Sequence, residues 1–305
     1  MKQAILTSCE GDYDLGVAAL FNSAVESGFQ GEFHIYYKGA PPRWKNQFKE
    51  KDGRLYLKEI EIVMHKSARA RHMGYDKPFQ AAEVLEGNTD INTVFYADAD
   101  VVFLCPWMFM SRMAHVGVGV VMDSNFPLVP STHPWRIEWL RYCPKKIIND
   151  ERSFIYPNGG FFCVQRENIG FLDLWKTVTS RFETDGGDTR CYHMEARWQG
   201  VNSDQDLLAA ALSAWDGPVS IVGPEAMGFT GHYFILSHAI ERPKPWRRFC
   251  VKEALRGHAP KRTVYFYQNY ANGDVNSLSS FNLALRRIDY RIARMIGCIY
   301  RRPNA

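Results

Sequence analysis

The sequence lacks the features that mark several large classes of protein. Its longest apolar runs are about ten residues, well below the roughly 20 that a membrane-spanning helix needs. The first residues, MKQAILTSCEGDYD, contain too few apolar residues before the first acidic one to form a signal peptide. We therefore expect this segment to form a first β-strand and the protein to be cytoplasmic.

The sequence also has no paired cysteines. Its seven cysteines stand singly in the chain, with no CxxC pair: Cys9, Cys105, Cys143, Cys163, Cys191, Cys250 and Cys298. An odd number of scattered cysteines favours reduced thiols over a disulfide framework or a zinc site.

What is present indicates a globular α/β protein. Of the 305 residues, 46% are hydrophobic and 14% aromatic, which excludes a disordered chain. Strand-like and helix-like segments alternate along the first half and continue in the second. The spacing predicts strands at 4–9, 32–39, 92–97, 116–123, 159–165, 218–223 and 233–238, and helices at 14–27, 41–51, 77–87, 167–183 and 203–215, with a loop at 184–200. Such alternation predicts a mostly parallel sheet with helices on both faces.

Two aspartates interrupt the apolar run VFYADADVVF. Asp98 and Asp100 follow a predicted strand, and their i, i+2 spacing puts both carboxylates on one face if the strand continues. In open α/β sheets, ligands bind outside the carboxyl ends of the strands. Two carboxylates there form a hard-oxygen site for Mg²⁺ or Mn²⁺. The alternative is a pair of aspartates that cap a helix or stabilise a turn.

These residues carry a family resemblance. YADADVVF resembles the DxD motif of nucleotide-sugar glycosyltransferases with the GT-A fold, a Rossmann-like, mostly parallel sheet flanked by helices. PNGGFFCVQ, NSDQDLLAAAL and SHAIERPKPW resemble later motifs of the retaining glycosyltransferase family 8 and its bacterial relatives that build surface polysaccharide. The motifs occur in the family's order between about residues 4 and 246. The resemblance implies a catalytic domain at residues 1–256, and we assign residues 257–305 to a C-terminal extension.

The resemblance implies a metal set and a phosphate ligand. Asp98 and Asp100 would bind the metal through oxygen and His238 through nitrogen, and such a mixed set suits Mn²⁺ better than Mg²⁺. Lys244 would lie near the donor's phosphates, and Asp98 also belongs to the donor site. The alternative for His238 is a buried histidine whose hydrogen bond goes to the backbone.

Other residues of the donor site come from the first strand and from a helix. Thr7 would bind the ribose or base, and Tyr13 would stack on the base. Asp12 has the alternative of a helix cap. The family usually has an arginine on the helix before its DxD motif, and this chain has Lys77, which either takes the phosphate-binding role or lies on the surface. The glycine between the family's last histidine and lysine is also missing.

The sugar end of the site would be formed by four polar residues and two glycines. The resemblance places Asn158, Asp123, Asp204 and Gln205 as catalytic residues around the sugar, with Gly159 and Gly160 in the donor site. Asp204 has the alternative of a simple N-cap. Acceptor contacts are expected in loop 184–202 and segment 124–139.

The net charge of +4 comes from one end of the chain. Residues 281–305 carry a charge of +5, which leaves the preceding residues at −1. On one helical face lie Leu285, Ile288, Ile292, Met295 or Ile296, and Ile299, and largely off it lie Arg287, Arg291 and Arg294. This pattern predicts that residues 281–302 bind an anionic membrane surface. The alternative is a helix docked on the core with solvated arginines. No nucleic acid is expected as a partner, because the body is slightly acidic.

The function predicted is a metal-dependent transfer of a hexose from a UDP-sugar to a glycan or lipid-linked acceptor. By resemblance, the anomeric configuration is retained and the reaction serves bacterial surface polysaccharide synthesis at the inner face of the cytoplasmic membrane. Three alternatives stay open. They are an inverting transferase with Asp123 or Asp204 as base, a sugar-nucleotide nucleotidyltransferase, and a non-catalytic nucleotide-sugar-binding protein.

Overall fold

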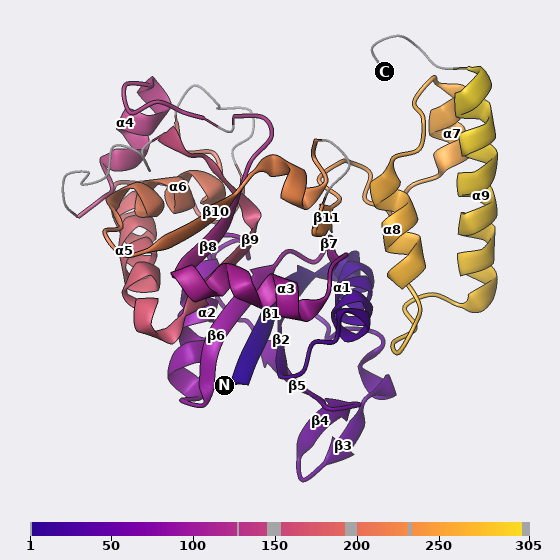
Figure 1. Cartoon of the computed structure of the whole chain (residues 1–305), viewed down its shortest axis with the longest axis horizontal. Coiled ribbons are helices and arrows are strands. Elements are labelled where there is room, and N and C mark those ends of the chain that lie inside the picture. Colours follow the sequence, from indigo (N-terminus) through magenta and orange to yellow (C-terminus); the bar gives the residue numbers. More distant parts are fainter. Residues whose placement is uncertain (1, 127, 145–153, 193–199, 231–233, 301–305) are drawn as a thin grey trace.

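The computed structural model describes residues 2–126, 128–144, 154–192, 200–230 and 234–300 (Figure 1). Its strands are β1 (Lys2–Glu10), β2 (Glu32–Lys38), β3 (Lys49–Lys51), β4 (Arg54–Leu57), β5 (Ile60–Lys66), β6 (Ile91–Ala97), β7 (Val101–Phe103), β8 (Val118–Met122), β9 (Pro157–Gln165), β10 (Val219–Val222) and β11 (Leu236–His238). Its α-helices are α1 (Asp14–Ser27), α2 (Lys77–Gly87), α3 (Trp107–Ser111), α4 (Pro134–Leu140), α5 (Gly170–Thr184), α6 (Asp204–Ala214), α7 (Cys250–Leu255), α8 (Arg262–Tyr270) and α9 (Ser280–Ile299).

One large sheet organises the chain, with strand order β10-β8-β9-β6-β1-β2-β5-β4-β3. Its centre, β6-β1-β2-β5, is parallel, and β9 runs antiparallel between β8 and β6. A second, two-stranded sheet pairs β11 with β7. The predicted α/β class with a mostly parallel sheet is confirmed.

The side chains of β1 alternate between two apolar cores, one on each face of the sheet. Ala4 and Leu6 pack in the core that also contains residues of α2, α5 and α6, whereas Ile5 packs in the core with residues of α1 and α3. This alternation follows from the pleat of a strand, whose successive side chains point to opposite faces. Because both faces are covered, polar groups gather at the ends of the strands.

The predicted helix at 41–51 is wrong. The chain there forms only a short 3₁₀ turn, Lys45–Gln47, and then β3, which pairs with β4. Trp44 and Phe48 are buried against each other, and the indole of Trp44 donates to the Asp14 carbonyl at 2.8 Å. Asp52 and Gly53 both have positive φ, as a tight hairpin turn requires. Burial of these aromatic rings and the Asp-Gly turn outweighed the helical spacing.

Three helices close the chain at one side of the molecule (Figure 1). α8 packs on α1, and α9 packs on α7 and α8 through Leu283, Tyr290 and Ala293. In the described part of the chain, no helix combines the length and the apolarity needed to cross a membrane. The predicted boundary at residue 256 stays a prediction, and α7, which precedes it, shares a small apolar cluster with α9.

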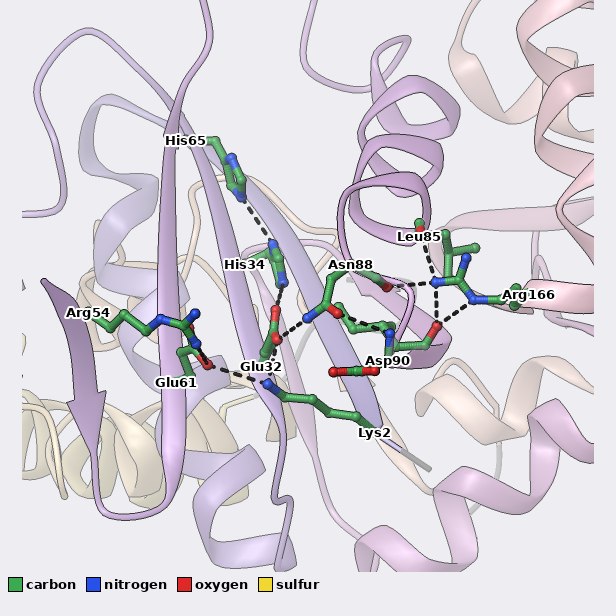
Figure 2. A network of polar contacts seen from close by, with 11 residues as sticks. Lys2, Glu32, His34, Arg54, Glu61, His65, Leu85, Asn88, Asp90 and Arg166 are labelled. Carbon is green, nitrogen blue, oxygen red and sulfur yellow. Dashed lines mark hydrogen bonds and ion pairs between the residues drawn. The ribbon is translucent and has the colours of Figure 1, made fainter. Parts of the chain in front are cut away.

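A polar network begins at the amino-terminal ends of β1 and β2 and extends along β2 to His65 of β5 (Figure 2). The buried carboxylate of Glu32 accepts from Asn88 at 2.6 Å and His34 at 2.8 Å, and Lys2 forms an ion pair with it at 2.5 Å. His34 in turn meets His65 at 3.0 Å. Glu32 and Lys2, the centre of this network, lie at the opposite end of the strands from the aspartate pair.

Candidate metal and donor site

Strand pairing brings the two aspartates and a distant histidine together. Asp98 and Asp100 stand between β6 and β7, and β11 pairs antiparallel with β7 so that His238 lies opposite Val101. The three side chains offer ligand atoms that all lie within 4.8 Å of one another. The His238 Nε2 atom is 3.2 Å from an Asp100 oxygen and 3.9 Å from an Asp98 oxygen.

The donor set fits a divalent cation. Two carboxylates and one imidazole form the mixed oxygen and nitrogen set that Mn²⁺ or Mg²⁺ accepts. Among the described residues, no group hydrogen-bonds the buried Nδ1 of His238, so the backbone-bonded alternative does not describe this histidine. A Cβ on Gly160 would come within 2.3 Å of the His238 ring, which explains a glycine there. The carboxylates face the site and cap no helix.

Asp100 is held in its ionised form. Burial by itself would raise the pKa of Asp100, but His238 and Lys244 outweigh this effect and lower the pKa below its usual range. The Lys244 ammonium bonds the Asp100 carboxylate and also donates to the Ala239 carbonyl at 2.8 Å. The predicted phosphate ligand Lys244 therefore lies beside the metal set.

Lys77 is the second cation of the site, and its surface alternative is wrong because only 2% of the residue is exposed. Its ammonium lies 2.8 Å from an Asp204 oxygen and 3.1 Å from an Asp98 oxygen, and it donates to the Gly159 carbonyl at 2.8 Å. Burial would lower the pKa of Lys77, but the carboxylates of Asp204 and Asp98 raise it above its usual range. Lys77 thus links the metal set to the predicted sugar end.

The predicted sugar-end residues form one hydrogen-bonded group. Asn158 donates to the Asp123 carboxylate at 2.7 Å, and Gln205 donates to the same oxygen at 3.2 Å. The other end of Gln205 accepts from the Gly159 amide at 2.9 Å, and Asn158 accepts from the Gly160 amide at 2.9 Å. These bonds join the residue that follows β8 to the start of β9 and the start of α6.

Two hollows meet at the metal set. One, of about 480 Å³, is lined by residues 8–13, at the end of β1 and in the turn that follows, together with Asp98, Asp100, Lys244 and Arg247. The other, of about 750 Å³, is lined by Asp123, Asn158, Gln205 and aromatic residues of the 124–139 segment. Lys77, Asp98 and His238 line both. Both volumes lie in the range of small-molecule sites.

The predicted nucleoside residues lie in different places. Tyr13 lines the first hollow and packs edge-on against Trp246. Thr7 is fully buried in β1 and is not among the residues that line either hollow. Asp12 forms an ion pair with Arg247 at the rim, with one contact at 2.6 Å, and does not cap α1.

Asp204 is not the N-cap of α6, since Ser203 occupies that position and Asp206 accepts from the Asn202 and Ser203 amides.

Two tyrosines that were not predicted from the sequence donate hydrogen bonds to the carboxylates of the site. Tyr96 donates to Asp98 at 2.8 Å, and Tyr192 donates to Asp204 at 2.7 Å. Tyr96 was detectable, because it precedes Asp98 by two residues.

The predicted acceptor segments are partly visible. Asn125, Phe126 and Trp135 from the 124–139 segment, and Tyr192 and Asn202 from the 184–202 loop, line the second hollow. Residues 127 and 193–199 of these segments lie outside the described residues.

Comparisons with known proteins show the fold. No protein-family model matches the sequence, and no curated protein is similar to it. The galactosyltransferase LgtC was crystallised with donor and acceptor sugar analogues. Its superposition covers 88% of this chain and 96% of LgtC, with a TM-score of 0.54 and 14% sequence identity. The bifunctional glycosyltransferase WbbM matches 93% of this chain over 51% of its own, with a TM-score of 0.53 and 9% identity. GlyE of Streptococcus pneumoniae matches 100% of this chain over 66% of its own, with a TM-score of 0.50 and 12% identity. The chain therefore has the fold of bacterial glycosyltransferases.

Proposed function

We propose that the chain is a metal-dependent glycosyltransferase that moves a hexose from a UDP-sugar to a glycan or glycolipid acceptor, with retention, in bacterial surface polysaccharide synthesis. The observation that carries this proposal is the Asp98, Asp100 and His238 set at the junction of two hollows, in a fold shared with LgtC. LgtC was crystallised with donor and acceptor sugar analogues, so its fold holds both kinds of ligand.

The metal site would take Mn²⁺ or Mg²⁺ through Asp98, Asp100 and His238. A bound divalent cation would supply Lewis-acid stabilisation to the departing diphosphate. Lys244, which already lies beside Asp100, adds a positive charge for the same phosphates. Lys77 pairs with Asp98 and Asp204 at the same time, so the metal ligand and the sugar ligand stay in fixed relation.

The nucleoside would occupy the hollow beside residues 8–13, with Tyr13 against the base. The predicted contact of Thr7 with the ribose or base gains no support from its position, since Thr7 is fully buried and lines neither hollow. The sugar would lie over Asn158, Gly159, Gly160 and Gln205. An active-site glutamine was substituted in LgtC, and Gln205 is the glutamine that bridges β9 to Asp123 here.

Retention is supported by how the carboxylates are occupied. Asp123 accepts from Asn158, Gln205 and the Asn125 amide, and Asp204 is held by Lys77 and Tyr192. An inverting mechanism needs one of these carboxylates to accept the acceptor's proton, and their oxygens already accept hydrogen bonds or pair with Lys77. A front-face route asks for no such base, because the leaving phosphate oxygen can accept the acceptor's proton. NMR analysis of the product anomer distinguishes the two routes.

We also propose that α9 attaches the protein to the anionic inner face of the cytoplasmic membrane. Phe281, Leu285, Ile288, Ile292, Met295 and Ile299 stay 39% to 91% exposed, although α9 is docked on α7 and α8 by a different face. Exposed apolar side chains beside arginines fit the interface of an anionic bilayer. The predicted row thus lies outside the packed interface, and the docked alternative describes only the opposite face of α9.

The function is tested by a thermal-shift screen of UDP-sugars with and without Mn²⁺, followed by transfer assays. We expect one UDP-sugar to raise the melting temperature in the presence of Mn²⁺, and Asp100→Ala to abolish that rise. A wild-type-like turnover in Asp100→Ala would overturn the site assignment. Binding without transfer or hydrolysis would instead favour the non-catalytic alternative.

A further inference from the structure

A third hollow lies beside the amino-terminal half of α9 and is lined by none of the residues of the metal set. It has a volume of about 560 Å³ and lies between the turn after α8 and the first half of α9. Arg287 and Arg291 line it from α9, and Asn272 and Asn276 line it from the turn. The site proposed above makes no use of this hollow.

The two arginines have no acidic partner among the described residues. Arg287 makes one hydrogen bond, to the Gln268 carbonyl at 3.3 Å, and the Arg291 guanidinium makes no hydrogen bond or ion pair with the described residues. The nearby acid, Asp274, is already paired with Lys58 at 2.8 Å. Asp289 points the other way and accepts from the Cys250 and Val251 amides at the start of α7. The hollow therefore presents two uncompensated positive charges one helical turn apart, which is the arrangement that binds a phosphate.

The hollow opens beside the exposed apolar row of α9. Ile288 lines the hollow and also belongs to the row that runs from Phe281 to Ile299. Figure 1 shows α9 at the edge of the molecule, with α7 and α8 on its inner side. An anionic group bound between the arginines would therefore sit next to apolar side chains that no described residue buries.

We propose that this hollow is a binding site for the phosphate head group of an anionic phospholipid, whose acyl chains would lie along the apolar row. This inference rests on the membrane attachment proposed above and adds a defined head-group contact to it. A soluble phosphate or a nucleic acid would use the arginines but would gain nothing from Ile288 and its neighbours. The lipid is therefore the occupant that uses both parts of the surface.

The test compares two arginines on the same helix. Arg291 lines the hollow, whereas Arg294 is exposed on α9 outside it, so Arg291→Gln and Arg294→Gln remove equal charge. Binding of the full chain is measured by co-sedimentation with phosphatidylcholine vesicles that contain phosphatidylglycerol. Arg294→Gln should weaken binding about fivefold, as expected for one surface arginine. Arg291→Gln should weaken it at least about tenfold more, because it also loses a charge-assisted hydrogen bond.

A second pair tests the apolar part. Ile288→Ser is compared with Val116→Ser, since these side chains are 52% and 56% exposed and Val116 lies in the 3₁₀ turn after α3. Only Ile288→Ser should weaken vesicle binding. Glycerol 3-phosphate in solution should compete only weakly with the vesicles for the protein. If it prevented co-sedimentation as effectively as additional vesicles do, a soluble phosphate would be the occupant. Binding of a DNA duplex that depends on Arg291 but not on Ile288 would likewise overturn the lipid assignment.

The outcomes separate this inference from the proposed function. Equal losses for Arg291→Gln and Arg294→Gln would overturn the head-group site and leave general membrane attachment standing. No binding of the wild type to anionic vesicles would refute the attachment itself. Transfer to a soluble acceptor should be unchanged in all four variants, so a failure of the glycosyltransferase proposal would appear independently in the wild type.

Discussion

Two charged clusters stand at opposite ends of the same sheet, and their contacts differ. At the amino-terminal ends, Glu32 is enclosed by Lys2, His34 and Asn88 (Figure 2). At the carboxyl ends, Asp98 and Asp100 face two hollows and a histidine whose Nδ1 has no hydrogen-bond partner in the described residues. Both clusters pair buried acids with cations, so buried charge alone does not identify a site.

The difference lies in what the charges still lack. The Glu32 carboxylate has its bonds satisfied inside the protein, which is what a structural network requires. The Asp98 and Asp100 carboxylates converge with His238 on a space that another atom can enter. The comparison predicts that the same chemical change, carboxylate to amide, will affect activity at one end of the sheet and stability at the other.

The largest effect is expected for Asp100→Asn. Loss of one metal ligand should reduce transfer by about a thousandfold or more, because several kcal/mol of stabilisation of the leaving diphosphate are lost. The melting temperature should fall less than in Glu32→Gln. Turnover with Mn²⁺ and thermal unfolding are measured on the same preparation. Activity within tenfold of wild type would remove Asp100 from the metal set.

Lys77→Met should affect both properties. The variant leaves the buried carboxylate of Asp204 and the half-buried carboxylate of Asp98 without their shared cation, which should cost about 3–5 kcal/mol of stability in the metal-free protein. Mn²⁺ should restore part of this loss, since the metal offers Asp98 a new partner. The measurement is urea unfolding with and without Mn²⁺. If Mn²⁺ raised the free energy of unfolding by the same amount in Lys77→Met and in wild type, a link between Lys77 and the metal set would be contradicted.

Glu32→Gln should affect stability alone. The amide cannot accept from Lys2, His34 and Asn88 as the carboxylate does, and we expect a loss of about 2–3 kcal/mol in the free energy of unfolding. The transfer rate, measured well below the melting temperature, should stay unchanged. A tenfold loss of transfer in a folded Glu32→Gln protein would show that the two ends of the sheet are coupled.

The sequence predicted the parts of the site that follow from local pattern. Asp98 and Asp100 could be found because they interrupt an apolar strand, and the Asp204 and Gln205 helix start has a readable polar signature. The sequence could not show that β11 pairs with β7 and so delivers His238, because that register depends on tertiary packing. It also could not show which face of α9 is buried. Small and aromatic residues, Tyr290 and Ala293, pack on α7, while the more regular aliphatic row stays outside.

The smallest effect expected is a loss of stability on acidification that arises in the network around Glu32 and His65. Burial would raise the pKa of Glu32, but hydrogen bonds from His34 and Lys2 outweigh it and lower the pKa to about 2. Burial, together with the charge of His34, lowers the pKa of His65 to about 4. Both groups therefore bind protons more readily in the unfolded chain than in the folded one, so stability falls as the pH falls.

The pH window follows from these values. The contribution of His65 to stability is complete above its ordinary pKa of 6.5 and is lost as the pH falls towards 4. The contribution of Glu32 to stability is lost at lower pH, between its ordinary pKa of 4.5 and about 2. Between pH 7 and pH 4 we expect a loss on the order of 1–2 kcal/mol, allowing for the partial exposure of His65. Urea unfolding at several pH values measures it, and His65→Gln should flatten the curve between pH 6.5 and 4. If Asp100→Asn flattens this part of the curve as much as His65→Gln does, the acid response does not belong to the network around Glu32 and His65. The two clusters would then not differ in how they make stability depend on pH.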